Sequence, residues 1–328
     1  MERVQFGQTD MEVSVIVLGT WVTGGWAWGG SDETESLNAL LKAFEMGINF
    51  IDTAPVYGFG KSEWIVGNAL KEWGSRERVF VATKCGLEWD EQERIRRNSK
   101  PERIYREADE SLRRLGIEQI DLYQVHWPDT GVPFEASMEA MLRLRELGKI
   151  RYIGLSNFNR EQVEECLRHA AVVSLQPPFN VFERGAEEEL LPFCADQGLA
   201  TLVYGGLCRG LLTGKFKGDE KFPRGDLRRA DPKFKPDRFM QYVKAVRELE
   251  KLAAGYGRTV AQFSLRWALQ QKGVTTVIAG ARTAAQVEDN VGVSGWKIEP
   301  EDLARVEEIL NRHIKTPVGP EFMSPRAD

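Results

Sequence analysis

Histidine and cysteine are scarce in this chain of 328 residues, which has three histidines and four cysteines. The cysteines are widely spaced and form no Cys-x-x-Cys motif, which disfavours a disulfide framework or a zinc site. This pattern is typical of a protein in a reducing compartment. A barrel hydrolase or isomerase that holds its metal with several histidines would lack its usual ligands here. Carboxylate-bound Mg²⁺ stays open on this count alone, but we expect no metal site.

Long apolar runs and uninterrupted basic tracts are also missing. No run approaches the roughly 20 residues of a membrane span, and acidic residues interrupt the segment from Met1 to Thr20 where a signal peptide would be apolar. The formal net charge is −5, and every Lys/Arg-rich stretch has acidic neighbours. We therefore expect a cytoplasmic protein that binds a small molecule rather than nucleic acid or a membrane, with its oligomeric state left open.

Short runs rich in β-branched and aromatic residues alternate with amphipathic stretches along the chain. The strand-like runs cover residues 15–20, 49–54, 79–84, 120–126, 150–156, 172–178, 199–205 and 275–280. The stretches with helical spacing include 34–46, 62–73, 101–115, 134–147, 160–168 and 186–197. This alternation predicts an α/β protein with a (β/α)8 TIM barrel. An open doubly wound sheet is the alternative, but no G-x-G-x-x-G motif follows an early run.

The predicted barrel accounts for most of the chain, and residues 1–328 are expected to form a single domain because such barrels reach about 250 residues and more with insertions. Residues 206–236 are rich in Gly, Pro, Lys and Arg and predict a long loop after strand 7, at a rim where long loops usually serve binding. From residue 300 onward we expect one extra C-terminal helix and then a loose extension. Residues 4–14 are expected to form a small hairpin on the barrel floor.

Four polar residues lie at or just beyond the ends of predicted strands: Asp52, Tyr57, Lys84 and His126. The carboxyl ends of barrel strands converge on one rim, which is where such folds place their active sites. An ammonium group beside a tyrosine stabilises the phenolate and lowers the phenol pKa, so Lys84 is expected to activate Tyr57 for proton exchange with a carbonyl oxygen. Asp52 would hold the lysine charged, and His126 would donate a hydrogen bond to the same oxygen.

Each of these four side chains has a structural explanation when taken alone. Asp52 can cap a turn, Tyr57 can be a loop aromatic, Lys84 can be a solvated strand end, and His126 can be a core histidine. Compatible roles on three adjacent predicted strands favour an active site over those explanations.

The sequence resembles the aldo/keto reductase family over nearly its whole length. The matching motifs are LGTW at 18–21, INFIDTAPVYGFGKSEWIVGNAL at 48–70, VATKCG at 81–86, DLYQVHWPD at 121–129, GKIRYIGLSNF at 148–158, LQPPFN at 175–180, GLLTGK at 210–215 and GARTAAQVEDN at 280–290. The resemblance implies that Asp52, Tyr57, Lys84 and His126 form the catalytic tetrad. It also implies hydride transfer from NADPH to a carbonyl carbon, with Tyr57 as the proton donor.

The resemblance implies a cofactor site as well. Ser156, Asn157 and Gln176 match residues that bind the nicotinamide carboxamide, and Tyr204 matches the aromatic that stacks on the nicotinamide ring. The pyrophosphate loop and the adenosine segment are matched, respectively, by Arg209, Gly210, Leu212 and Lys215 and by Gly280, Arg282, Gln286 and Asn290. Further cofactor contacts are expected from Gly19, Thr20, Trp21, Gly205 and Leu207.

Arg282 is the residue on which the expected NADPH preference rests. Its guanidinium can bind a 2′-phosphate in bidentate fashion, and no acidic residue in the same motif would accept a ribose 2′-hydroxyl. The alternative is a solvated arginine at a junction between a loop and a helix. Many family members carry Ser-Pro after the stacking tyrosine, whereas Gly205 and Gly206 follow Tyr204 here.

Tryptophans are concentrated around the predicted tetrad, and an aromatic rim suits small aldehydes with some apolar surface. The candidate substrate pocket consists of Trp21, Trp26, Trp28, Trp89 and Trp127. The run TWVTGGWAWGG and the HWPD and QPPFN motifs look most like those of bacterial NADPH-dependent aldehyde reductases of the glyceraldehyde reductase type. Such enzymes can also oxidise small polyols in reverse. An NADPH-binding regulatory or sensing subunit with little turnover is the alternative function, and a metal-assisted sugar isomerase or hydrolase is a third that has too few histidines.

Overall fold

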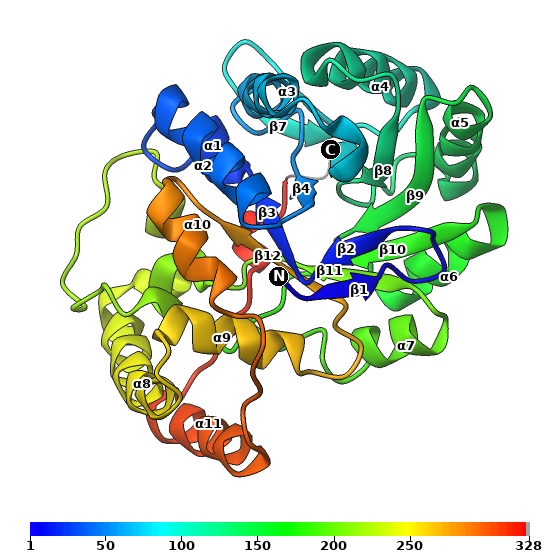
Figure 1. Ribbon diagram of the computed structural model, residues 1–328. Helices are drawn as coiled ribbons and strands as arrows, with labels where there is room; N and C mark the ends of the chain where they lie inside the picture. Colours follow the sequence, from blue (N-terminus) through cyan, green and yellow to red (C-terminus); the bar gives the residue numbers. More distant parts are fainter. Residues whose placement is uncertain (326–328) are drawn as a thin grey trace.

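The computed structural model describes residues 1–325, and a closed barrel of parallel strands lies at the centre of this part of the chain (Figure 1). Around the barrel the strands are β3 (Ile16–Gly19), β4 (Phe50–Asp52), β5 (Phe80–Cys85), β8 (Ile120–Val125), β9 (Ile150–Ser156), β10 (Val172–Gln176), β11 (Ala200–Val203) and β12 (Thr276–Gly280). β12 pairs in parallel with β3, which closes the barrel. Every predicted strand-like run overlaps one of these strands, and only Cys85 of β5 lies outside its run, so the barrel prediction is confirmed.

The helices over the predicted stretches between residues 34 and 168 begin and end within one residue of the prediction. Helices surround the barrel. They are α1 (Trp21–Gly24), α2 (Glu33–Glu45), α3 (Lys61–Trp73), α4 (Pro101–Leu115), α5 (Phe134–Glu146), α6 (Arg160–His169), α7 (Leu190–Asp196), α8 (Pro236–Gly255), α9 (Val260–Leu269), α10 (Ala284–Val291) and α11 (Pro300–His313). Local sequence explains several ends. Asn159 and Gln162 form a capping box at the start of α6, and Gly116 ends α4 in the left-handed conformation at φ 64°.

A small N-terminal hairpin closes the floor of the barrel, as the sequence predicted. β1 (Arg3–Gln5) pairs antiparallel with β2 (Glu12–Ser14), and the hairpin lies in front of the barrel in Figure 1. The rings of Phe6 and Phe50 meet edge to face with centroids 5.3 Å apart, and Met11 is buried in the same cluster. The open end of the barrel is therefore the opposite rim, where the strands finish.

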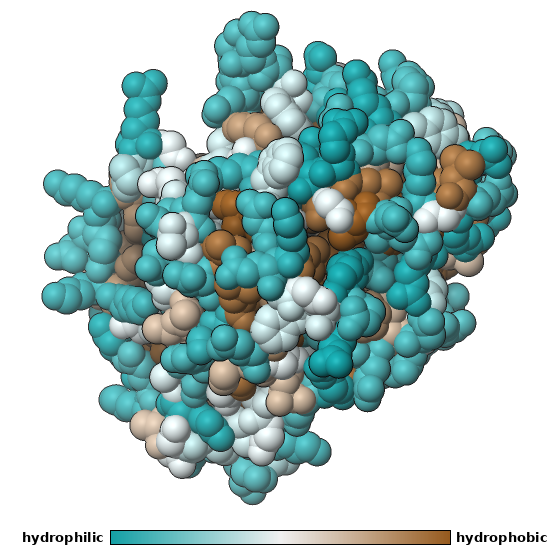
Figure 2. All heavy atoms as spheres, turned by 45° about the horizontal axis from the view of Figure 1, so that its top comes forward, coloured by the Kyte–Doolittle hydropathy of each residue, from teal (hydrophilic) through white to brown (hydrophobic). Residues whose placement is uncertain are grey.

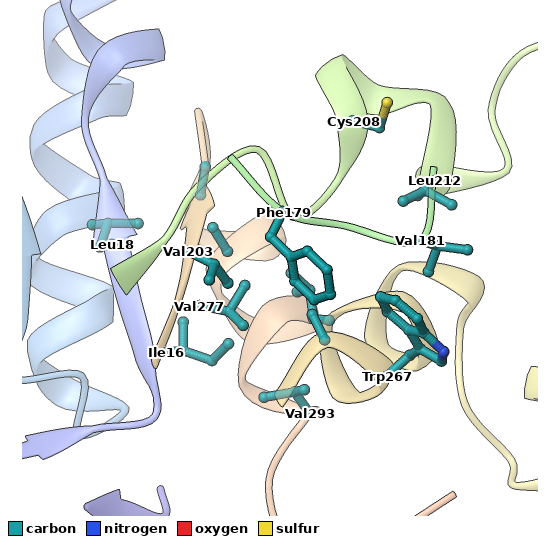
Figure 3. Close-up of a cluster of buried hydrophobic side chains, with 14 of the residues drawn as sticks. Ile16, Leu18, Phe179, Val181, Val203, Cys208, Leu212, Trp267, Val277 and Val293 are labelled. Atoms are coloured by element: carbon teal, nitrogen blue, oxygen red, sulfur yellow. The ribbon is translucent and has the colours of Figure 1, made fainter. Parts of the chain in front are cut away.

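A second apolar cluster joins the outer face of the barrel to the helices around it. Figure 3 shows Ile16, Val203 and Val277 from three neighbouring strands on one side of this cluster. Phe179 and Trp267 stack on the other side with ring centroids 5.5 Å apart. The face in Figure 2 is mostly hydrophilic, and apolar side chains appear there in small recessed areas. Among residues 1–325 no helix is both long and apolar enough to cross a membrane.

The region after β11 differs from a plain loop and helix. Three short 3-10 helices, η2 (Cys208–Thr213), η3 (Leu227–Arg229) and η4 (Pro232–Phe234), punctuate the predicted long loop. Two helices, α8 and α9, then follow before β12. The low periodicity of residues 206–236 therefore indicates irregular structure correctly, and the extra helix lies beyond it.

Two other segments depart from the sequence predictions. A hairpin of β6 (Leu87–Trp89) and β7 (Ile95–Arg97) follows β5 and was not predicted. The segment after α11, which contains η5 (Glu321–Met323), was expected to be loose, and this expectation is wrong as far as Pro325. Lys233 Nζ donates to Gly319 O at 3.1 Å, and Arg97 Nη2 donates to Ser324 Oγ at 2.6 Å. In Figure 1 the red segment runs from α11 back across the barrel toward the side of β7.

The buried floor provides a test of the fold. Phe6→Ala should lower the free energy of unfolding by about 3–5 kcal/mol, because it leaves a cavity between the hairpin and the barrel interior. Urea unfolding followed by circular dichroism measures this change. Trp64→Ala is the matched control, since the Trp64 side chain is 54% exposed and its removal should cost within about 0.5 kcal/mol. Equal losses in the two variants would show that Phe6 is not part of the cooperative core.

Candidate active site

A cavity of about 700 Å³ opens at the rim where the barrel strands finish. Asp52 is the last residue of β4, Lys84 lies near the end of β5, and His126 directly follows β8. Tyr57 is in the loop after β4. The side chains of Asp52, Tyr57 and His126 line the cavity, and Lys84 lies beneath them, fully buried. The structure therefore brings together the four residues that the sequence singled out.

The Lys84 ammonium is the centre of this arrangement. Its Nζ donates to Asp52 Oδ2 at 2.7 Å, to Thr53 O at 3.0 Å and to the Tyr57 hydroxyl at 3.2 Å. An ammonium has three N–H donors, so all of them have partners. A buried charge is stable only when it is paired and hydrogen-bonded in this way.

The second oxygen of the Asp52 carboxylate is held by two amides from other strands. Gln176 Nε2 donates to Asp52 Oδ1 at 2.8 Å, and Gln124 Nε2 donates to the same atom at 3.3 Å. Gln176 was predicted only as a nicotinamide contact, and Gln124 was not predicted at all. The signal for Gln124 is its position two residues before His126, which places both side chains on the same face of β8.

The protonation states differ from the sequence-based expectation for Tyr57. Burial, and then the Asp52 carboxylate, hold the Tyr57 pKa well above its ordinary value. The expected lowering by Lys84 is therefore wrong for this arrangement, because burial raises the Tyr57 pKa and the Asp52 carboxylate raises it further. Burial lowers the pKa of Lys84, and Asp52 opposes that change. Tyr57 thus keeps its proton at neutral pH and can donate it.

His126 faces Tyr57 and stays neutral. The two rings lie edge to face with centroids 5.8 Å apart. Burial and then the Lys84 charge lower the His126 pKa well below its ordinary value. Asn157 Nδ2 donates to the His126 carbonyl at 2.9 Å, which fixes the backbone at the start of the loop. One imidazole N–H is then available to a substrate oxygen in the cavity.

The predicted nicotinamide contacts form a hydrogen-bonded group on the other side of the cavity. The Tyr204 hydroxyl donates to Asn157 Oδ1 at 2.8 Å, and Ser156 Oγ donates to Gln176 O at 3.1 Å. Asn157 has a positive φ of 64°, a conformation that asparagine tolerates better than most residues. These contacts fix the polar groups next to a flat aromatic ring, which suits a planar amide-bearing ring.

The glycines after Tyr204 have a steric cause. Gly205 has φ 74°, a conformation that a serine would rarely adopt, and a side chain at Gly206 would place its Cβ 2.8 Å from Leu265 and Val277. The departure from the Ser-Pro pattern is therefore built into the packing of this loop against α9 and β12.

Arginine and lysine side chains line the end of the cavity farther along the loop. Arg282 donates from its backbone N–H to Gln286 Oε1 at 2.8 Å, and burial lowers the pKa of its guanidinium, as does the charge of Arg228. Arg228, which the sequence analysis missed, pairs with Asp226 and lies with its Cζ 4.4 Å from the Phe222 ring centroid. Lys215 also lines this end. Such a set of cations fits the phosphates of a dinucleotide.

Arg209 lines the cavity but is already paired. Its Nε donates to Asp231 Oδ2 at 2.7 Å and its Nη1 to Glu183 Oε2 at 3.0 Å. Lys233 Nζ donates to Glu183 Oε1 at 2.7 Å, which completes a neutral group of two cations and two carboxylates. These pairs fix the loop after β11 in place, and they leave Arg209 little free charge for a pyrophosphate.

Most residues predicted to bind cofactor line the cavity. These are Gly19, Thr20, Trp21, Ser156, Asn157, Gln176, Tyr204, Gly205, Leu207, Arg209, Gly210, Lys215, Gly280, Arg282, Gln286 and Asn290. Leu212 is instead fully buried in the apolar cluster outside the barrel. Its side chain therefore supports the loop from behind.

Aromatic side chains form the substrate end of the cavity. Trp21 stacks on Tyr57 with centroids 5.9 Å apart and meets Trp28 edge to face at 5.5 Å. Trp26 and Trp127 also line the cavity, whereas Trp89 packs against Phe59, outside the described lining. The C-terminal segment also contributes apolar side chains to the cavity, and these were not predicted. They are Phe322, Met323 and Pro325.

Comparisons with known proteins point to one family. The model of the aldo/keto reductase family matches residues 15–311. The aldo-keto reductase YhdN of Bacillus subtilis (strain 168) is 47% identical over 99% of this chain and 98% of its own. The NADH-specific methylglyoxal reductase of Escherichia coli (strain K12) is 34% identical over 94% of this chain and 98% of its own. The solved structure of the glycerol dehydrogenase AKR11B4 from Gluconobacter oxydans superposes with a TM-score of 0.89 at 44% identity, covering 98% of this chain and 99% of that one.

The fold and the site define a barrel oxidoreductase. The chain belongs to the aldo/keto reductase family. It is an oxidoreductase of that family. The cofactor varies among its relatives, since one is named as NADH-specific and the name of another, from Schizosaccharomyces pombe, carries NADP(+).

The pKa shifts at Tyr57 and His126 predict the pH dependence of carbonyl reduction. His126 stays neutral above its lowered pKa, so kcat/KM should be flat from about pH 6 to pH 8, without a step near the ordinary histidine pKa of about 6.5. The raised pKa of Tyr57 keeps the donor protonated, so the decline should begin only above about pH 10. Initial rates of carbonyl reduction from about pH 6 to above about pH 10, with enzyme pre-incubated at each pH, test the flat region and the decline. An inflection near pH 6.5 would show that His126 titrates.

Proposed function

We propose that this protein is an NADPH-dependent reductase of small aldehydes, glyceraldehyde-like or aromatic, which works in reverse on the corresponding alcohols and polyols. It would belong with the bacterial glyceraldehyde reductase-like enzymes of its family. The observation that carries this proposal is the hydrogen bond of 3.2 Å between Lys84 Nζ and the Tyr57 hydroxyl, in a cavity walled by aromatic side chains.

The four polar residues would divide the work at the carbonyl oxygen. Tyr57 would donate its proton to that oxygen during reduction, because its raised pKa keeps it protonated. Neutral His126 would donate a hydrogen bond to the same oxygen and orient the aldehyde. Lys84 would stabilise the phenolate left behind, and Asp52 would keep the lysine charged and in place. The nicotinamide cofactor supplies the hydride in reduction and accepts it in oxidation when it is bound.

NADPH is the proposed cofactor because cations line the adenosine end of the cavity. Lys215, Arg228 and Arg282 all reach this wall, and Asp226 is the carboxylate that pairs with one of them. A 2′-phosphate would meet a site with surplus positive charge, which a ribose hydroxyl would not use. The NADP(+)-dependent relative is consistent with this choice, and the NADH-specific relative shows why a direct measurement is needed.

The remaining proposals concern the whole chain. Residues 1–328 would act as one catalytic domain, because the cavity takes residues from β3 through to the segment after α11.

A cytoplasmic location would suit the cysteines, since Cys85, Cys166, Cys194 and Cys208 are all buried and unpaired within the described residues. Such thiols persist in a reducing compartment.

The role of Tyr57 can be tested by removing its hydroxyl. Tyr57→Phe should lower kcat for glyceraldehyde reduction by at least about 100-fold, because general acid catalysis contributes about 10²- to 10⁴-fold. The dissociation constant of NADPH, measured by protein fluorescence, should change less than about twofold, since the phenol acts on the substrate. Tyr152→Phe is the control, because its hydroxyl bonds Asp10 on the barrel floor. Retained turnover in Tyr57→Phe would overturn the mechanism.

The role of Arg282 predicts a change in cofactor preference. Arg282→Ala should weaken NADPH binding by about tenfold or more, corresponding to about 1.4 kcal/mol for a lost charge-assisted contact, and NADH binding by less than about threefold. Any loss through the Arg282 contact with Trp28 O affects both cofactors equally, so the ratio is the informative quantity. Arg305→Ala, at an exposed ion pair with Asp302, is the control. Equal weakening of both cofactors in Arg282→Ala would show that Arg282 does not bind the 2′-phosphate.

The wild-type enzyme tests the alternative function. Tight NADPH binding without turnover of either aldehyde class would favour a sensing subunit.

A further inference from the structure

Arg97, at the end of β7, connects three separate segments beside the substrate end of the cavity. Its Nη1 donates to Pro128 O at 2.9 Å, and its Nη2 donates to Ser324 Oγ at 2.6 Å. Its Cζ lies 5.4 Å from the ring centroid of Trp127. One guanidinium therefore holds the β6–β7 hairpin, the loop that follows His126 and the C-terminal segment together.

Each of the three segments contributes apolar side chains to the cavity wall. Ile95 comes from the hairpin, Trp127 from the loop after His126, and Met323 from the C-terminal segment. Arg97 itself is not among the lining residues, so it acts through the side chains that it holds. The C-terminal segment has its other fixed point at Gly319, whose carbonyl accepts from Lys233 on the cofactor side.

The chemistry of these contacts requires arginine. A guanidinium presents a planar fork that can donate to two acceptors at once while its face lies over an aromatic ring, whereas an ammonium is a compact point charge. Burial lowers the pKa of Arg97, and Asp129 opposes that change, so the group is partly removed from water where its hydrogen bonds are stronger. The remaining contacts of Ser324 are few, since its side chain is exposed.

We propose that Arg97 is a positioning residue that sets the substrate wall and so determines how well aldehydes with an aromatic substituent bind. This inference rests on the proposed aldehyde reduction and concerns the side of the cavity away from the cofactor loop. An aromatic ring attached to the reacting carbonyl has a large apolar face to place against the wall formed by Trp127 and Met323. A three-carbon hydroxyaldehyde has little apolar surface and depends less on that wall.

The test compares two aldehydes in Arg97→Met. KM for a substituted benzaldehyde should rise about tenfold, which corresponds to about 1.4 kcal/mol of lost binding. KM for glyceraldehyde should rise less than about threefold, with kcat for glyceraldehyde and the NADPH dissociation constant within about twofold of wild type. A purely structural role would instead lower the melting temperature and shift both aldehydes and the cofactor together.

Neighbouring variants sharpen the result. Arg96→Met is the matched control, because Arg96 lies on the same strand but pairs with Glu88 and is 58% exposed. Arg97→Lys should recover less than half of the loss, since an ammonium lacks the planar fork that lies over the Trp127 ring while it donates to Pro128 O and Ser324 Oγ. Ser324→Ala should produce part of the effect, and the double variant with Arg97→Met should be no worse than Arg97→Met alone.

Hydrogen exchange gives a readout that does not depend on turnover. Arg97→Met should speed amide exchange in residues 319–325 and leave the loop after β11 unchanged. Unchanged exchange together with an unchanged ratio of the two KM values, in the presence of wild-type turnover, would overturn the inference alone. No turnover of either aldehyde by wild type would overturn the proposed function, and with it the substrate part of this inference.

Discussion

The buried ion pair between Lys84 and Asp52 is the interaction on which the site depends. Two charges removed from water are costly unless each is fully hydrogen-bonded. The 2.7 Å contact between them is completed by Thr53 O and the Tyr57 hydroxyl on one side and by Gln124 and Gln176 on the other. These partners come from β4, β5, β8, β10 and the loop after β4, so the pair is satisfied only in a closed barrel. Fold and chemistry are therefore stabilised by the same contacts.

The neutrality of the pair also sets the protonation of its neighbours. Burial raises the Tyr57 pKa and the Asp52 charge raises it further, so Tyr57 is not driven toward phenolate. The same burial, with Lys84 close by, keeps His126 uncharged. At neutral pH the cavity thus presents a phenol and a neutral imidazole, two hydrogen-bond donors whose rings lie edge to face with centroids 5.8 Å apart. Such an arrangement favours a substrate whose oxygen gains negative charge during reaction.

Features written in local sequence could be predicted, and features made by distant contacts could not. The strands follow from the period of the sequence, and the gathering of Asp52, Lys84 and His126 at one rim follows from their positions at strand ends. The hairpin of β6 and β7 was not predicted, because its sequence is rich in charged residues and gives no clear strand pattern. The C-terminal segment is ordered by Arg97 and Lys233, which lie far away in the chain. The error in the expected Tyr57 pKa has the same origin, because the sequence does not show how deeply the pair is buried.

The contacts that hold the two sides of the cavity differ in strength. This difference is relevant to the range of substrates within the family. The cofactor loop is fixed by a buried group of four charges around Glu183 and Arg209, and breaking such a group leaves unpaired buried charge, which costs about 3–5 kcal/mol. The substrate wall rests on a short hairpin and on a chain end held by single hydrogen bonds, each worth about 1.5–3 kcal/mol when an arginine donates. Changes to the wall therefore perturb the fold less than changes to the cofactor loop. Relatives named for glycerol and for methylglyoxal can thus share this barrel while their substrates differ.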